Sequence, residues 1–245
     1  MSEQFRTSKY PEKFKQHPIS ELEKIDAPSA LFPANVPQSE NVKGVNWGNH
    51  FLTECKSAWD GLNEQRVTRD PEHTAEGHVL RVSESAQKQR QRIEKEFDRA
   101  REQFGLARTA YKQAIADQAK LTEDRYGSEI RSVLRSMKDT DRQTAIIQAI
   151  QEGDAQTVSA AVSGPAISVG LTREQQKNFR RMFEKKQAPE AFEALEQINR
   201  AEEKSLAAFE MFTASTGKLG EEQRAHEIRK RQEAARKAAA PLSAA

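Results

Sequence analysis

The stretch that decides the fold is residues 74–126, TAEGHVLRVSESAQKQRQRIEKEFDRAREQFGLARTAYKQAIADQAKLTEDRY. Its apolar or small residues recur in steps of three and four once the polar gaps at Gln89 and Gln118 are counted: Val79, Val82, Ala86, Ile93, Phe97, Ala100, Phe104, Ala107, Tyr111, Ile115 and Leu121. In an α-helix this spacing places a narrow apolar stripe on one face. The stretch therefore predicts one helix, about 75 Å long at 1.5 Å per residue. Such a helix needs a second helix to cover its stripe.

The composition favours thin helical bundles over a compact globule. Of the 245 residues 36 % are hydrophobic and 31 % are charged, which is little interior for a chain of this length. The net charge is only +2, so the chain is not a polycation that binds nucleic acid indiscriminately. A single cysteine, Cys55, rules out an intrachain disulfide and fits a reducing compartment. No apolar run reaches the roughly 20 residues that span a bilayer, and the first residues lack a signal-peptide core. We expect a soluble protein made in a cytoplasm, without a membrane partner.

Residues 1–44 predict an extended arm. Prolines at positions 11, 18, 28, 33 and 37 are too closely spaced for a regular helix. Large apolar residues are scattered among them, and five are candidate protein-binding anchors: Phe5, Tyr10, Phe14, Leu31 and Phe32. Isolated anchors in an extended segment are typical of a strap that becomes ordered on a partner surface. The alternative is a leader without fixed structure.

Shorter helices are expected on both sides of the long one. Residues 45–68 contain a short amphipathic helix with Trp47, Phe51, Cys55, Trp59 and Leu62 on one face, which we expect to pack on the long helix. Residues 128–187 predict a small head of four helices, at 128–138, 142–152, 155–163 and 173–186. Their expected caps are Thr140 or Asp139, then Asp154, and a capping box between Thr172 and Gln175.

Pro189 opens a return helix over residues 189–215, followed by a small hinge at 213–220 and a charged, Ala-rich tail at 221–245. The tail has one large apolar residue, Ile228, which predicts either a solvated helix or no fixed structure. The fold class predicted is all-α: an elongated, coiled-coil-like antiparallel helical hairpin with a small four-helix head at its tip and an extended N-terminal arm. Its seam comprises Ile93, Phe97, Phe104 and Tyr111 on the long helix, and Phe192, Leu195, Phe209 and Phe212 on the return helix. Apolar stripe left uncovered is expected to pack on another copy or another protein.

The chemistry-bearing residues do not form a recognisable active site. The five histidines are dispersed, the glycines form no phosphate-binding loop, and Cys55 lies on an apolar helix face. We therefore predict no catalytic residue, no metal site, no cofactor and no enzymatic activity. One local charge bias is present in residues 173–186, where a basic helix offers candidate contacts to nucleic acid or an acidic surface: Lys177, Arg180, Arg181, Lys185 and Lys186. The alternative is the solvated outer face of the head.

Three segments carry a resemblance: IRSVLRSM at residues 130–137, residues 142–153, and VSGPAISVGLT at residues 162–172. Over about residues 75–212 the chain resembles uncharacterised helical proteins encoded in the structural (head) modules of tailed phages and prophages. The resemblance implies a long helix, a small insert and a return helix. It also implies a virion or head-assembly component, made in the host cytoplasm, whose partners are other virion proteins (capsid, portal or tail component) and copies of itself.

The hypothesis from the sequence is thus a non-enzymatic structural or assembly protein of a phage virion, head- or connector-associated. It would dock by its N-terminal arm and space its partners with a helical rod. Two alternatives stay open. One is a nucleic-acid-associated protein that uses the basic helix 173–186. The other is a transient assembly scaffold that is absent from the mature particle.

Overall fold

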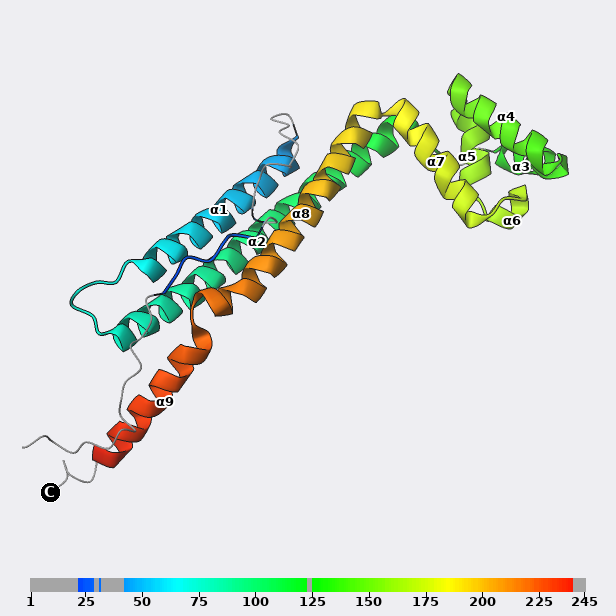
Figure 1. Cartoon of the computed structure of the whole chain (residues 1–245). Helices are drawn as coiled ribbons and strands as arrows, with labels where there is room; N and C mark the ends of the chain where they lie inside the picture. Colours follow the sequence, from blue (N-terminus) through cyan, green and yellow to red (C-terminus); the bar gives the residue numbers. More distant parts are fainter. Residues whose placement is uncertain (1–21, 29–30, 32–41, 123–124, 240–245) are drawn as a thin grey trace, which may run out of the picture. The chain divides into compact units, whose positions relative to one another are not determined.

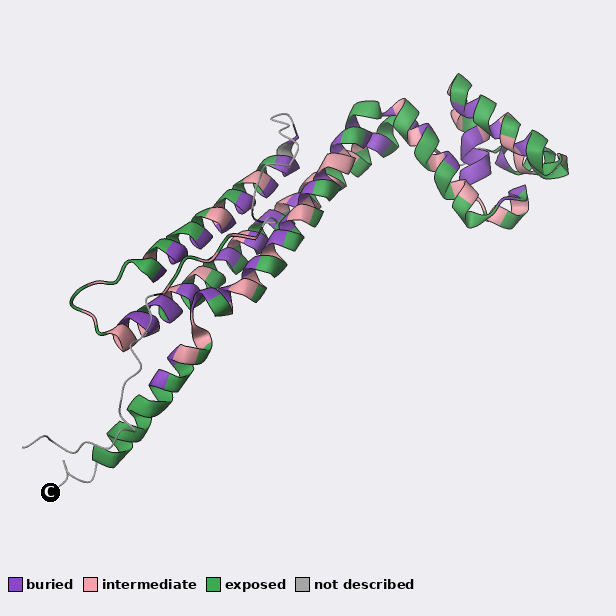
Figure 2. Ribbon diagram, in the orientation of Figure 1, coloured by how far each residue is buried: buried purple, intermediate pink, exposed green. Residues whose placement is uncertain are grey.

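The computed structural model describes residues 22–28, 31, 42–122 and 125–239 (Figure 1). The predicted all-α class is confirmed, because 84 % of these residues are helical and none of them lies in a strand. The helices are α1 (Lys43–Val67), α2 (Ala75–Ala119), α3 (Gly127–Ser136), α4 (Asp139–Glu152), α5 (Ala155–Ser163), α6 (Ala166–Val169), α7 (Arg173–Gln187), α8 (Pro189–Leu219) and α9 (Glu222–Ala239). Figure 2 shows buried residues recurring along the long helices, with exposed residues between them.

The chain divides into two compact units, and the long helices α1, α2 and α8 contribute residues to both. Unit 1 comprises Met1–Pro28, Lys56–Arg92 and Phe212–Ala245, and unit 2 comprises Ser29–Cys55 and Ile93–Met211. Unit 1 therefore contains α9, and unit 2 contains α3 to α7.

In unit 2, the second part of α2 packs along α8. The Phe97 ring stacks on the Phe209 ring with centroids 4.4 Å apart, and the Arg108 guanidinium donates to the Glu202 carboxylate. Further along α2, Ile115 packs in one cluster with Ala191 and Phe192. Residue numbers rise along α2 as they fall along α8, so these two segments run antiparallel.

The first turns of α1 approach both of these helices closely because they present glycines. A Cβ atom on Gly44 would lie 2.9 Å from Cγ1 of Ile198 on α8 and 3.1 Å from Cβ of Ala107 on α2. A Cβ atom on Gly48 would lie 3.3 Å from both Cβ of Ala201 and Cζ of Phe104. Glycine leaves the space that this close helix packing needs.

The long helix ends earlier than predicted, at Ala119 and not at Tyr126. Lys120 adopts a left-handed conformation with φ of 49°, and Leu121 turns into the core of the head. Gly127, which directly follows the predicted helix, is the first residue of α3. The start agrees with the sequence, since the Thr74 hydroxyl accepts a hydrogen bond from the Gly77 amide at 3.0 Å.

The return helix is longer than predicted and continues through the expected hinge to Leu219. Within this segment the buried Thr216 hydroxyl donates to the Phe212 carbonyl, so this polar group is satisfied inside the helix. The break lies at Gly220 and Glu221, where Glu221 has a φ of 51°. A Cβ atom on Gly220 would lie 2.5 Å from Cβ of Ala86, so only glycine fits where the chain turns against α2.

Two other features differ from the prediction: the start of α1 and the burial of part of the tail. α1 covers Lys43–Val67 and begins two residues before the helix expected at 45–68. The tail is not wholly solvated, because Ala225 and Ile228 of α9 are buried in a cluster with Val79 of α2. The predicted solvated helix describes residues 229–239, all of which are exposed, whereas Ala225 and Ile228 dock the first turns of α9.

The head has five helices where four were predicted. The apolar connector before Leu171 forms the short helix α6, and α4 begins at Asp139 with Lys138 in the cap position, not Thr140 or Asp139. Two predicted caps are confirmed: the Asp154 carboxylate accepts from the Gln156 and Thr157 amides, and Thr172 and Gln175 form a capping box. The core of the head includes Leu134, Ile146, Ile150, Val158, Val162, Val169, Leu171, Phe179 and Phe183.

The Asp154 cap makes the stability of the head depend on pH. Burial of the Asp154 carboxyl opposes its ionisation, but hydrogen bonds from the Thr157 side chain and from the Thr157 and Gln156 amides lower its pKa below the usual 3.8. A carboxyl whose pKa is lowered by folding stabilises the folded state above pH 3.8, and this contribution is lost as the pH falls through the folded-state pKa. We expect Asp154→Ala to destabilise the chain by about 1 kcal/mol near pH 7.

Urea unfolding followed by circular dichroism at several pH values measures this effect. The difference from the parent chain should shrink below pH 3.8, and Asp154→Ser, which keeps a capping oxygen, should lose much less. A difference that is constant between pH 7 and pH 3 would contradict the assignment.

Candidate binding surfaces

Most of the predicted arm anchors lie outside the described residues, namely Phe5, Tyr10, Phe14 and Phe32. The fifth, Leu31, is fully buried within the chain and so offers no surface to a partner. The prediction that Leu31 anchors the arm on a partner protein is therefore wrong, because Leu31 is buried within its own chain.

Residues 22–28 of the arm pack on α1 of the same chain. The Ile25 amide donates to Oδ1 of Asn63 at 3.0 Å, and the Ile25 carbonyl accepts from Nδ2 of Asn63 at 2.7 Å. The indole N–H of Trp59 also donates to that carbonyl, at 3.3 Å. A segment outside helices and strands needs such partners because its backbone groups are not paired within the segment. This part of the arm is thus a strap whose partner surface is α1.

Arg66 joins the strap to the end of α8 in unit 1. Its guanidinium donates to the Glu23 carbonyl at 2.7 Å and to the Leu219 carbonyl at 2.9 Å, and it lies 2.7 Å from the Glu221 carboxylate. The Arg66 carbonyl in turn is hydrogen-bonded to Nε2 of His78 at 3.0 Å. The Arg66 side chain is buried, and its guanidinium caps the Leu219 carbonyl at the end of α8.

Arg142 has the same role in the head. It is buried, and it donates to the Leu134 carbonyl at 2.8 Å, the Met137 carbonyl at 2.8 Å and the Gly170 carbonyl at 2.5 Å. The Asp139 carboxylate lies 3.2 Å from the same guanidinium. Arg142 therefore fastens the ends of α3 and α6 to the start of α4. Neither arginine was predicted from the sequence, although each lies one turn from a buried apolar residue on its helix, which was the available signal.

The basic helix predicted at residues 173–186 is α7, and three of its five candidate cations are engaged within unit 2. Arg181 lies 2.6 Å from the Glu196 carboxylate and also over the Phe192 ring, 5.6 Å from its centroid. Arg180 donates to the Val162 carbonyl at 3.3 Å, and Lys186 donates to the Gln151 carbonyl.

The remaining two candidates on α7, Lys177 and Lys185, are exposed. Burial raises the pKa of Glu184 on the same helix, while Arg180 opposes that change. The five cations therefore do not form one free basic surface.

The predicted seam residues are all removed from solvent to some degree. Ile93, Phe104 and Phe212 are fully buried, Phe97 and Phe192 are nearly so, and Tyr111, Leu195 and Phe209 are half-buried. Phe212 belongs to unit 1, where its ring packs edge-on against Trp59 at a centroid distance of 6.4 Å. These residues serve helix packing and leave little apolar area for a partner.

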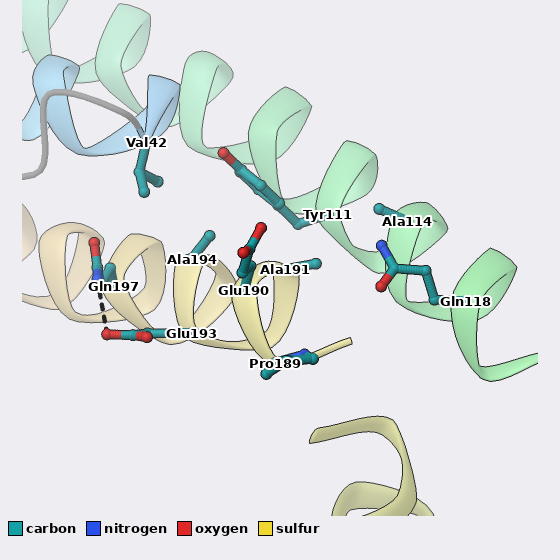
Figure 3. A pocket seen from close by; sticks show the side chains of 10 residues that line it. All are labelled: Val42, Tyr111, Ala114, Gln118, Pro189, Glu190, Ala191, Glu193, Ala194 and Gln197. Carbon is teal, nitrogen blue, oxygen red and sulfur yellow. Dashed lines mark hydrogen bonds between the residues drawn. The ribbon is translucent and has the colours of Figure 1, made fainter. Parts of the chain in front are cut away.

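Sequence reasoning missed an open cleft of about 930 Å³ in unit 2, between α2, α8 and the residue before α1 (Figure 3). It is lined by Val42, Tyr111, Ala114, Gln118, Pro189, Glu190, Ala191, Glu193, Ala194 and Gln197. The lining contains two carboxylates, of Glu190 and Glu193, and no cation. Nε2 of Gln197 donates to Oε1 of Glu193 at 3.4 Å, as the dashed line in Figure 3 marks. Such a lining suits a cationic side chain with an apolar stem.

Within residues 22–28, 31, 42–122 and 125–239, no group of three or more histidine, cysteine, aspartate or glutamate residues is placed to hold a metal ion. No helix in this part of the chain has the length and apolar character that crossing a bilayer requires. Comparison with known proteins adds no assignment, since no family model, curated protein or solved structure matches the chain.

The Arg142 contacts predict a specific weakening of the head. Replacing this buried guanidinium by an apolar side chain removes the side-chain donor of three carbonyls, and breaking a buried charged network typically costs about 3–5 kcal/mol. We expect Arg142→Met to increase amide hydrogen exchange throughout α3 to α6. Arg173→Met, which removes an exposed cation at the start of α7, is the matched control. Equal exchange in the two variants would show that Arg142 does not fasten these helices.

Proposed function

We propose that this protein is a non-enzymatic structural or assembly component of a phage particle, associated with the head or connector. In this proposal the long helices set the spacing between partners, and the N-terminal arm docks on a capsid, portal or tail component. Copies of the chain are further candidate partners.

The observation that carries the proposal is the length of α2 together with the burial of the apolar residues along one of its faces. The helix has 45 residues, which corresponds to about 68 Å, and buried residues recur from Val79 to Ala119. The buried arginines Arg66 and Arg142 both donate hydrogen bonds to main-chain carbonyls of neighbouring segments. Buried charges that hold helix ends together support a structural role for the protein.

The finer architecture is part of the same proposal. The antiparallel pairing of residues from α2 and α8 supports an elongated, coiled-coil-like hairpin. The head, α3 to α7, would form its tip, and residues 1–21 would continue the strap as an extended arm. In the head, Ile167 is 76 % exposed and Val133 is 56 % exposed, so both side chains are free to contact a partner.

The assignment to a phage particle rests on the resemblance of residues 130–172 to proteins of phage structural modules. A transient scaffold, absent from the mature particle, fits the same helices. Nucleic-acid binding through α7 has less support, because Arg180, Arg181 and Lys186 already have partners within the chain.

A substitution in the arm tests the docking role better than a deletion does. Ile25 and Leu31 are part of the packed chain, so removing residues 1–44 would also damage the fold. We expect a combined Phe5→Ser, Tyr10→Ser and Phe14→Ser variant to lose at least tenfold in incorporation into particles, since each buried anchor contributes about 2 kcal/mol. Mass spectrometry of purified particles measures the incorporation.

The matched control replaces three cations of the same segment, Lys9→Ser, Lys13→Ser and Lys15→Ser, and should be incorporated normally. Undiminished incorporation of the aromatic variant would exclude docking by these anchors. Particles that contain no parent chain, although it is present during assembly, would select the transient scaffold.

A further inference from the structure

The outer part of α9 is a charged helix that the rest of the chain leaves uncovered. Every residue from 229 to 239 is exposed, and Figure 2 shows these turns as exposed. This segment has five basic residues and one acidic residue, Glu233, a net charge of +4; the basic residues are Arg229, Lys230, Arg231, Arg236 and Lys237. The first turns of α9 are held in place by buried Ala225 and Ile228, so unit 1 presents the charged segment as an ordered helix.

The basic residues of this segment have few and weak partners. Arg231 lies 3.5 Å from the Glu76 carboxylate, and Lys237 lies 2.6 Å from the Glu233 carboxylate, both as solvent-exposed pairs. Exposed pairs of this kind exchange readily for another anion. No ion pair within 4.0 Å involves Arg229, Lys230 or Arg236 in the part of the chain that the structure describes. Their charge is therefore available, unlike that of Arg180 and Arg181 on α7.

Four of these cations share one face of the helix. Arg229 and Arg236 are two turns apart, as are Lys230 and Lys237, so each pair is separated by about 10.5 Å along the axis. At about 100° per residue the four positions fall within an arc of roughly 120°. Arg231 lies on the opposite side, where it faces Glu76. Glu233 lies in the middle of the same arc, so the face carries four long cationic side chains around one carboxylate, a net charge of +3.

The composition of the segment selects the kind of partner. Apart from its charged residues and Gln232, residues 229–239 contain only alanine. A helix that docks in a protein groove needs large apolar anchors, and a helix that lies in a membrane interface needs tryptophan, phenylalanine or leucine on one face. Neither is present. A phosphate backbone is recognised by charge without apolar anchors.

We propose that residues 229–239 of α9 bind the phosphate backbone of duplex DNA without sequence preference, through Arg229, Lys230, Arg236 and Lys237. This contact goes beyond the structural role proposed above and does not depend on it. It also differs from the nucleic-acid contact considered for α7, which has fewer free cations.

Fluorescence anisotropy of the full chain with a labelled 20-base-pair duplex of random sequence, between 25 and 200 mM NaCl, tests the proposal. Four phosphate contacts predict that the logarithm of the association constant falls with the logarithm of salt concentration with a slope of about −3.6. The combined Arg229→Gln, Lys230→Gln, Arg236→Gln and Lys237→Gln variant should bind at least tenfold more weakly and lose most of the slope. Glutamine is a good helix former, so circular dichroism should show α9 retained.

The matched control removes four exposed cations from α2: Lys88→Gln, Arg90→Gln, Lys95→Gln and Arg101→Gln. It loses the same net charge and should keep affinity and slope close to those of the parent chain. Three results would overturn the proposal: no binding at 25 mM NaCl, equal binding by the α9 variant and the parent, or a loss in the α2 control as large as in the α9 variant. Binding to vesicles with 30 % phosphatidylserine, but not to DNA, would also overturn it in favour of a lipid surface.

Discussion

The close approach of α1 to α2 and α8 at Gly44 and Gly48 is the constraint on which the rest of unit 2 depends. A helix as long as α2 cannot bury a narrow apolar stripe alone, and a second helix covers only one side of it. The glycines let α1 reach Ala107 and Phe104 on α2, and Ile198 and Ala201 on α8, within van der Waals contact. The buried aromatic residues near this point, Phe51 and Phe97, then pack at a centroid distance of 5.4 Å.

The described helices have many ends, and two buried arginines donate hydrogen bonds to carbonyls at several of them. Arg66 donates hydrogen bonds to carbonyls of the strap and of the end of α8, and Arg142 donates to carbonyls at the ends of α3 and α6. A guanidinium can do this because its five donors lie in a fixed plane, whereas a lysine has one compact charged group. Each unit therefore contains a buried arginine whose role is structural.

The sequence predicted what depends on local spacing. The stripe of α2, the cap at Asp154 and the capping box at Thr172 all follow from residues within one or two turns of each other. The end of α2 did not follow, because Lys120 takes a left-handed conformation that glycine or asparagine usually takes. The burial of Ile228 depends on the contact of α9 with Val79 of α2. The acidic cleft beside Tyr111 depends on how α8 is aligned along α2. Neither alignment can be predicted from the sequence of one helix alone. The sequence also does not show which cations have partners within the chain, and the structure shows such partners for three of the candidate cations on α7.

The most direct measurement of the central claim is a disulfide across the closest contact of α1 with α8. A Cβ atom at Gly48 lies 3.3 Å from Cβ of Ala201, close to the 3.5–4.5 Å that a disulfide requires. In a Cys55→Ala background, Gly48→Cys combined with Ala201→Cys should cross-link under mild oxidation, as detected by mass spectrometry of the joined peptides. Gly48→Cys combined with Ala207→Cys, an exposed position on the same helix, should stay reduced. No cross-link in the first pair, or equal cross-linking in both, would contradict the packing of α1 on α8.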